Sequence, residues 1–165
     1  MRIYILFVFS IFNLIFSSCE KDKPTPGERV DVAIDILLQN SIGEDLLNSQ
    51  TTNNLLNSDI KVYQIVNGTE TELYNSDLDC PRNFCIIDDG KNKVFRLFPI
   101  EKIEAQKASL LIKWNSSKSD RIIANVVSVQ NGSNSNTFCD SVWVNGILKF
   151  PNSEFAPARK FIHSM

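Results

Sequence analysis

The fold of this 165-residue chain is constrained most by a series of short segments rich in β-branched and aromatic residues. Such side chains favour extended backbone, and the Asn, Gly, Asp and Ser residues between the segments favour turns. Apolar residues do not recur at the helical spacing that an α/β fold would need. The pattern therefore predicts an all-β protein, an antiparallel β-sandwich of seven to nine strands.

Two pairs of segments predict β-hairpins. Asn67-Gly68 separates residues 60–66 from residues 70–74, and both turn residues tolerate the positive φ angles of a type I′ turn. Segments 84–87 and 94–98 flank a longer polar loop and predict a second hairpin. Further strands are predicted at residues 108–114, 122–129, 137–144 and 147–150, the last after another Asn-Gly pair.

The first strand is predicted from strict alternation. Val30, Val32, Ile34 and Ile36 alternate with polar or small residues, so one face should lie on the core and a face with acidic residues should lie in water. The acidic residues are Asp31 and Asp35.

Two polar loops are the expected recognition elements. Residues 40–58 are rich in Asn and contain the leucine pairs 46–47 and 55–56, which predicts a long loop pinned to the core. The polar break at 130–136 is the second loop. Loops of a rigid β-sandwich commonly carry partner contacts, so we expect binding at residues 41–58 and 130–136. Residues 101–107 are the one helical candidate.

The first eighteen residues have the layout of a cleaved export signal. Arg2 precedes an apolar run at residues 3–16, which is too short to span a bilayer comfortably, and Ser17-Ser18 precede Cys19. We expect cleavage before Cys19 and attachment of a lipid to its thiol. Phe16 stands where a lipid-attachment motif favours leucine, so plain secretory cleavage and an uncleaved anchor stay open as alternatives.

The mature chain then divides into two parts. Residues 19–28 are polar, charged and proline-bearing, which predicts a flexible tether. Residues 29–165 have the length of a single domain. We expect this domain to be monomeric and to be held at the outer membrane of the cell envelope.

The charge distribution argues against a nucleic-acid partner. Removal of residues 1–18 takes away only Arg2 among the charged residues and leaves sixteen basic against nineteen acidic residues, a net charge of −3. Nucleic-acid binding needs clustered basic residues, whereas those of this chain are scattered among acids.

Three cysteines remain after Cys19, and an odd number cannot all pair within one chain. Cys80 and Cys85 are close enough in sequence for a disulfide that closes a small loop and leaves Cys139 as a buried thiol. The alternative is that all three are small apolar core residues. Cys80, Cys85, Cys139 and His163 do not have the spacing of a zinc site, so no metal is expected.

Four segments give the chain its resemblance to known proteins: residues 16–19, Gly43-Glu44-Asp45-Leu46-Leu47, residues 78–84 and Val142-Trp143-Val144-Asn145-Gly146. With them it resembles a family of small Bacteroidetes lipoproteins of uncharacterised function with an immunoglobulin-like β-sandwich domain. The resemblance implies that sandwich type and an envelope location, but no site residues. The charged run at 20–23 is similar to the segment that sends such lipoproteins to the cell surface. An ordinary solvated linker is the alternative reading.

No set of residues in the sequence predicts catalysis. The only histidine, His163, lies two residues from the C-terminus, and only Cys139 could pair with it as a nucleophile. The acids at 77, 79, 88 and 89 lie in turn-like stretches, where Asp bonds to local backbone. Trp114 and Trp143 could stack on sugars, but Trp114 lies in an apolar run that favours core packing.

The sequence thus predicts a displayed envelope lipoprotein that acts as a non-catalytic binding or structural module. It has no predicted catalytic residue or cofactor, and its candidate partner is an envelope protein or a glycan. The alternative is a glycan- or polymer-processing enzyme whose carboxylates converge from separate loops.

Overall fold

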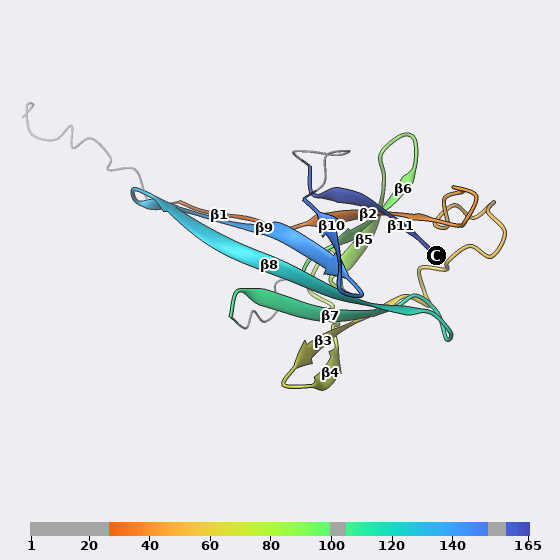
Figure 1. The fold of residues 1–165 in the computed structure, drawn as a ribbon, viewed down its shortest axis with the longest axis horizontal. Coiled ribbons are helices and arrows are strands. Elements are labelled where there is room, and N and C mark those ends of the chain that lie inside the picture. The colour runs from red at the N-terminus through yellow and green to blue at the C-terminus, as the bar shows by residue number, and fades with distance from the viewer. Residues whose placement is uncertain (1–26, 100–104, 152–157) are drawn as a thin grey trace, which may run out of the picture.

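The computed structural model describes residues 27–99, 105–151 and 158–165, and within these ranges the protein is all β with no helix (Figure 1). No helix in this part of the chain has the length and apolar character that a membrane crossing needs. The strands are β1 (Glu28–Asp31), β2 (Ile34–Gln39), β3 (Lys61–Val66), β4 (Thr69–Glu72), β5 (Phe84–Asp88), β6 (Lys93–Leu97), β7 (Lys107–Lys113), β8 (Ser119–Asn131), β9 (Asn134–Val144), β10 (Ile147–Phe150) and β11 (Lys160–Ser164).

The strands form two sheets, as the sandwich prediction requires. One has the order β1-β9-β8-β7-β3-β4, with β10 also paired to β9, and the other has the order β11-β2-β6-β5. The described ranges therefore contain eleven strands rather than seven to nine. The sheets are mixed rather than antiparallel, because the two outermost strands in sequence, β1 and β11, pair in parallel with β9 and β2. Terminal strands add to sheet edges without a hairpin, which leaves their direction free.

The predicted first strand is in fact two strands in different sheets. The chain leaves the larger sheet after Asp31 and enters the smaller sheet at Ile34. Val30 is 50 % exposed, whereas Ile34 and Ile36 are fully buried. The alternation is continuous in sequence, but Val30 at its start is exposed while the later three residues are buried.

Aromatic residues fill the core between the sheets. Phe95 stacks on Phe84 at a centroid distance of 4.6 Å and meets the edge of Trp114 at 5.0 Å. Trp114 is completely buried, which confirms the prediction that it packs in the core. Its neighbours come from both sheets, so the two sheets share one hydrophobic core.

The Asn-Gly pairs form the predicted tight turns. Asn67 and Gly68 have φ values of 49° and 79° and join β3 to β4, and Asn145 and Gly146 have φ values of 50° and 82° and join β9 to β10. Positive φ at both positions is the requirement of a type I′ turn, which only Gly and Asn meet at low cost. The hairpin of β5 and β6 is also confirmed.

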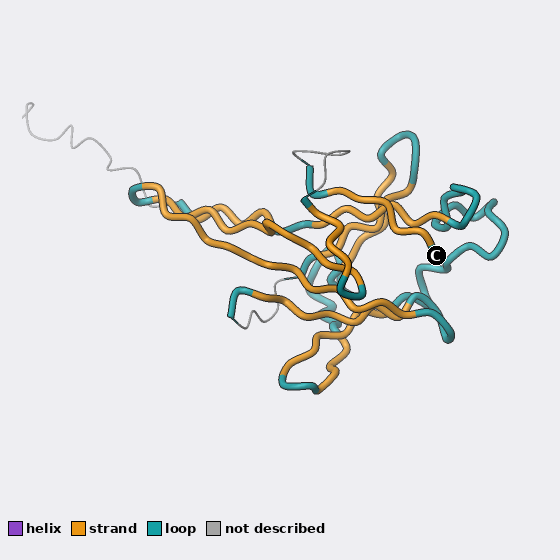
Figure 2. The backbone as a smooth tube through the Cα atoms, in the orientation of Figure 1, coloured by secondary structure: helices purple, strands orange, loops and turns teal. Residues whose placement is uncertain are grey.

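The predicted loop at 130–136 is wrong, because most of it is strand. β8 runs to Asn131 and β9 starts at Asn134, so only Gly132 and Ser133 form the turn. β7 pairs with β8 only as far as Asn125. The strand segments beyond the core residues Val126 and Cys139, at 127–131 and 134–138, project from the sandwich together with β1 (Figures 1 and 2). We call this three-stranded projection the arm. Polar residues at the end of a hairpin resemble a loop in sequence because no core lies beneath them.

The loop at 40–58 is pinned by three of its four leucines. Leu46, Leu47 and Leu55 are buried, whereas Leu56 is 56 % exposed. The amide of Leu55 donates to the carbonyl of Leu46 at 2.7 Å, which closes the loop on itself.

The helical candidate at 101–107 lies mostly outside the described residues. Of its described part, Ala105 and Gln106 have positive φ values and Lys107 begins β7, so these three residues are not helical.

Candidate functional site

Three depressions of the described surface are candidates for a binding site. One lies beside the arm, one beside the Cys80–Cys85 segment and one beside the C-terminal strand β11. Each contains at most one carboxylate: Asp31 in the first, none in the second and Asp120 in the third. None of the three therefore brings together the two carboxylates that glycoside hydrolysis uses.

The depression beside β11, about 450 Å³ in volume, lies next to a buried polar cluster around Asp120. Asp120 Oδ2 accepts hydrogen bonds from Trp114 Nε1 at 2.5 Å and from His163 Nε2 at 2.7 Å, and Oδ1 accepts one from Asn145 Nδ2 at 2.5 Å. Asp120 lies on β8 and His163 on β11, so their bond joins the two sheets. We call these four residues the Asp120 cluster.

The hydrogen bonds of the cluster hold Asp120 in its charged form. Burial on its own would raise the pKa of this carboxyl, but the bonds from Trp114, His163 and Asn145 outweigh burial and lower the pKa below its ordinary value. Both carboxylate oxygens are thus engaged inside the protein. An acceptor used in this way stabilises the fold and has little capacity left for a ligand.

His163 is therefore a structural residue, although its place near the C-terminus predicts a poorly held side chain. β11 pairs in parallel with β2, and the residue is only 9 % exposed. The signal in the sequence is the alternation of Phe161 and His163, which both face inward on β11. His163 does not pair with Cys139, whose Sγ donates instead to the carbonyl of Ser141 at 3.6 Å.

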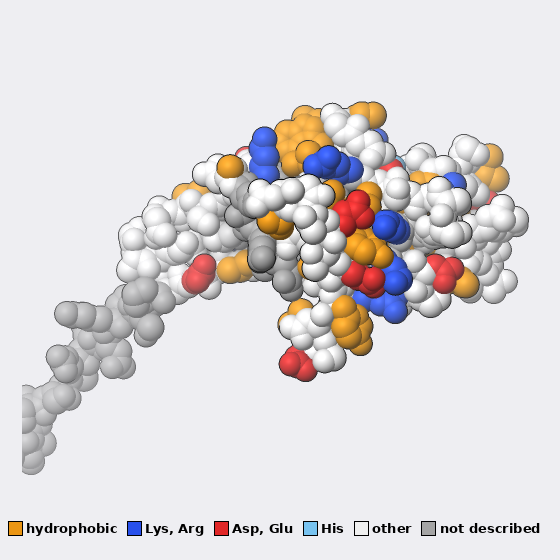
Figure 3. Space-filling view, turned by 90° about the horizontal axis from the view of Figure 1, so that it is seen from below, with side chains coloured by type: hydrophobic (Ala, Val, Ile, Leu, Met, Phe, Trp, Pro, Cys, Tyr) orange, Lys and Arg blue, Asp and Glu red, His pale blue; other side chains and the backbone are white. Residues whose placement is uncertain are grey.

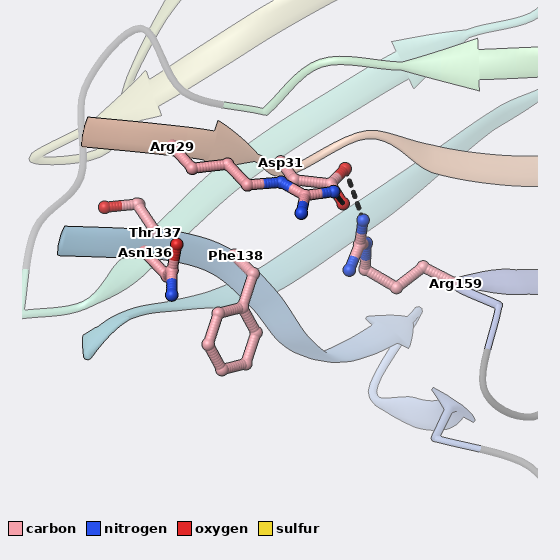
Figure 4. A pocket seen from close by; sticks show the side chains of 6 residues that line it. All are labelled: Arg29, Asp31, Asn136, Thr137, Phe138 and Arg159. Atoms are coloured by element: carbon pink, nitrogen blue, oxygen red, sulfur yellow. Dashed lines mark ion pairs between the residues drawn. The ribbon is translucent and has the colours of Figure 1, made fainter. Parts of the chain in front are cut away.

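The depression beside the arm is built differently (Figure 4). In the parallel pairing of β1 with β9, Arg29 lies opposite Asn136 and Asp31 opposite Phe138, so these four side chains share one face of the sheet. Arg159 reaches the same place from the segment before β11. We call this depression of about 300 Å³ the arm crevice; its lining is Arg29, Asp31, Asn136, Thr137, Phe138 and Arg159.

The two arginines of the arm crevice are held to different degrees. Arg159 forms an ion pair with Asp31 and donates from Nε to the carbonyl of Ala33 at 3.1 Å. Arg29 lies 3.9 Å from Asp31, and its side chain is 78 % exposed. Arg159 is thus fixed in place, whereas Arg29 is only loosely paired.

A second arginine–aspartate pair lies close to the arm crevice. Arg96 holds Asp35 with two hydrogen bonds of 2.7 and 2.8 Å. The bond to Asp35 raises the pKa of Arg96, and attraction to Asp31 adds to the effect. The predicted acidic face of the first strand is therefore matched by arginines. The guanidinium groups of both pairs number three and the carboxylates two. The region therefore has a net charge of one positive unit.

The second depression adjoins a disulfide between Cys80 and Cys85, whose Cα atoms are 5.4 Å apart. Within the loop it closes, Arg82 Nη1 lies within hydrogen-bond distance of three carbonyl oxygens, at residues 57, 58 and 60. This arginine fastens the loop to the segment before β3.

The remaining predicted residues take no part in a site. Burial raises the pKa of the free thiol of Cys139 to about 11, so the thiol stays protonated at neutral pH. Asp88 and Asp89 accept hydrogen bonds from backbone amides of their own turn, as turn residues do. The described ranges contain no group of His, Cys, Asp and Glu suited to hold a metal ion. Cys19 lies outside the described residues.

No protein-family model, curated protein or solved structure matches this chain. The candidate sites are therefore judged by their geometry.

Proposed function

We propose that the protein is an outer-membrane lipoprotein, anchored through Cys19, that acts as a non-catalytic binding module. One observation supports this arrangement. Gly27, the first described residue, lies at the tip of the arm, where its amide donates to Asn134 Oδ1 at 3.0 Å and its carbonyl accepts from the amide of Ser135 at 3.0 Å. The chain that leads to the anchor thus joins the domain at the far end of its longest projection (Figure 1).

The arm then acts as a spacer between the membrane and the sandwich. Eight residue steps separate Cys19 from Gly27 and reach at most roughly 28 Å when fully extended. The five residues 127–131 of the arm add about 17 Å at the rise of a β-strand. Tether and arm together can hold the sandwich away from the membrane, with the loop at 40–58 at the end opposite the arm tip (Figures 1 and 2).

This orientation separates the two predicted recognition segments. Residues 130–136 lie at the membrane side, whereas the loop at 41–58 lies at the distal side. A large partner outside the membrane reaches the distal loop and the flank of the arm more easily than the arm tip. The proposal includes a monomeric state and an immunoglobulin-like type of sandwich.

The described charges agree with a partner other than nucleic acid. On the face seen in Figure 3, Lys and Arg side chains lie among Asp and Glu side chains. The domain also forms the ion pairs Lys61–Glu72 and Lys113–Glu70. A nucleic-acid surface would need an uninterrupted basic stripe.

Replacement of Cys19 tests the anchor. In a Bacteroidetes host, the Cys19→Ala variant should lose acyl labelling and move from the membrane to the soluble fraction. Ser18→Ala, which keeps a small residue before the cleavage point, is the matched control and should behave as the wild type. Unchanged membrane association of Cys19→Ala would contradict the proposal.

Labelling of single cysteines tests the orientation. Thr52→Cys places a thiol in the exposed distal loop and Ser133→Cys places one at the arm tip. A bulky impermeant maleimide should react faster with Thr52→Cys in intact cells, while both should react equally in the detergent-solubilised protein. Faster reaction at the arm tip of anchored protein would contradict the spacer role of the arm.

Alanine replacement of residues 20–23 tests surface display separately. If the charged run directs export, protease accessibility on intact cells should fall while membrane association stays. Unchanged accessibility would leave the run as a simple linker.

A further inference from the structure

We propose that the arm crevice binds an acidic sugar, with the sugar's carboxylate on Arg29 and Arg159 and its ring against Phe138. The inference rests on the proposed binding function and names the class of ligand. It starts from guanidinium donors of the crevice that no described residue engages. Arg159 engages described residues through Nε and Nη2, and Arg29 does so only through Nη2 at 3.9 Å. No described residue accepts a hydrogen bond from Nη1 of either arginine.

The positions of the two arginines suit a carboxylate. They lie on either side of Asp31, and both are drawn toward it from different segments of the chain (Figure 4). A guanidinium group binds a carboxylate through two parallel donors, which gives orientation as well as attraction. Because Asp31 neutralises only one of the two arginines, an incoming carboxylate meets a net positive charge.

The other side of the crevice suits a sugar ring. Phe138 is partly exposed on β9, and Asn136, two residues before it, carries an amide that bonds to no described residue. An aromatic face packs against the C–H face of a pyranose, and an amide both donates to and accepts from hydroxyl groups. An acidic peptide would use the arginines but would gain less from this ring and amide.

The size and location of the crevice fit the same ligand. Its volume of about 300 Å³ is at the lower end for small-ligand sites and admits about one sugar unit of a longer chain. It opens on the flank of the arm, so an extended polymer can pass along it. Arg29, the exposed arginine, can close on the ligand without a change in the fold.

Binding measurements on the full-length chain in detergent test the proposal. The probe is a tetramer of galacturonic acid, and a neutral galactose tetramer, a sulfated galactan oligosaccharide and a glutamate-rich peptide are compared with it. The uronate should bind most tightly, and added salt should weaken its binding. Arg29→Gln should weaken uronate binding about tenfold, since one charge-assisted contact is lost.

Two further variants sharpen the result. Asp31→Asn removes the carboxylate that competes for the arginines, so it should tighten uronate binding by about threefold. Arg121→Gln is the matched control on the exposed surface of β8, away from the crevice, and should bind as the wild type. Circular dichroism checks that each variant is folded.

Three outcomes would overturn the acidic-sugar site. These are no uronate binding by the folded wild type, equal binding by Arg29→Gln and wild type, and peptide binding as tight as uronate binding with the same dependence on Arg29. The last result would assign the crevice to an acidic protein. None of them affects membrane anchoring through Cys19, so failure of this inference is distinct from failure of the proposed function.

Discussion

The Asp120 cluster and the arm crevice both combine an aspartate with basic and amide side chains, yet they differ in how completely the carboxylate is used. Asp120 accepts three hydrogen bonds of 2.5 to 2.7 Å within the protein and is nearly buried. Asp31 is about half exposed and forms ion pairs with two arginines, of which Arg159 is fixed and Arg29 is loosely held. The first arrangement joins two sheets, whereas the second has donors at the surface that no described residue engages.

This contrast separates stability from binding in one small domain. A buried polar group must be satisfied internally, because an unpaired one costs free energy of folding. A surface group can stay partly unpaired at low cost because water replaces the missing partner. Residues of the Asp120 cluster should therefore affect the free energy of unfolding, and residues of the arm crevice should affect ligand affinity.

The largest effect is expected for Asp120→Ala. The substitution removes three hydrogen bonds and leaves the buried donors of Trp114 and His163 without an acceptor, so the free energy of unfolding should fall by about 3 kcal/mol. Urea denaturation followed by tryptophan fluorescence measures the change. Asp77→Ala, an exposed aspartate in a turn, is the control and should stay within about 0.5 kcal/mol of wild type. A loss as small as that of the control would show that the cluster does not join the sheets.

Acid should remove the contribution of Asp120. Its pKa is lower in the folded protein than the ordinary value near 3.9 of the unfolded chain, so the stabilisation is complete above that value and is lost as pH falls through the folded pKa. The difference in unfolding free energy between wild type and Asp120→Ala should thus shrink as the pH falls below about 4. Other carboxylates cancel in this difference. A difference that grows in acid would contradict the assignment.

A smaller effect is expected for Arg159→Ala. Arg159 is mostly covered and holds both Asp31 and the carbonyl of Ala33, at the point where the chain passes from one sheet to the other. Its loss should lower the free energy of unfolding by about 1 kcal/mol, between the values for a buried and an exposed pair. The same denaturation experiment measures it. A loss of unfolding free energy equal to that of Asp120→Ala would show that Arg159 mainly holds the two sheets together.

The sequence predicts the elements that depend on local chemistry. The Asn-Gly turns, the hairpin of β5 and β6 and the burial of Trp114 follow from neighbouring residues and are confirmed. The split of the first strand and the extension of the arm do not follow, because they depend on where the core ends. Alternation at Val30 is the same in sequence whether or not a second sheet lies beneath it.

The candidate sites were missed for a related reason. Arg29 and Arg159 are 130 positions apart in the sequence. They come to one place because β1 pairs in parallel with β9 at one sheet edge and β11 pairs in parallel with β2 at an edge of the other sheet. Asp120 and His163 are likewise joined across the two sheets. For His163, the inward alternation of β11 is the available signal, whereas proximity to the C-terminus predicts a poorly held side chain.

The smallest effect on stability is expected for Arg29→Ala, and it is the sharpest test of the comparison. Its side chain is 78 % exposed and lies 3.9 Å from its only described ionic partner, so the pair contributes little to folding. The free energy of unfolding should stay within about 0.5 kcal/mol of wild type. Affinity for the uronate tetramer should nevertheless fall, because the lost guanidinium is the one free to meet the ligand. A substitution that leaves stability unchanged and still weakens binding assigns Arg29 to recognition. If stability fell with affinity, Arg29 would belong with the residues that hold the fold.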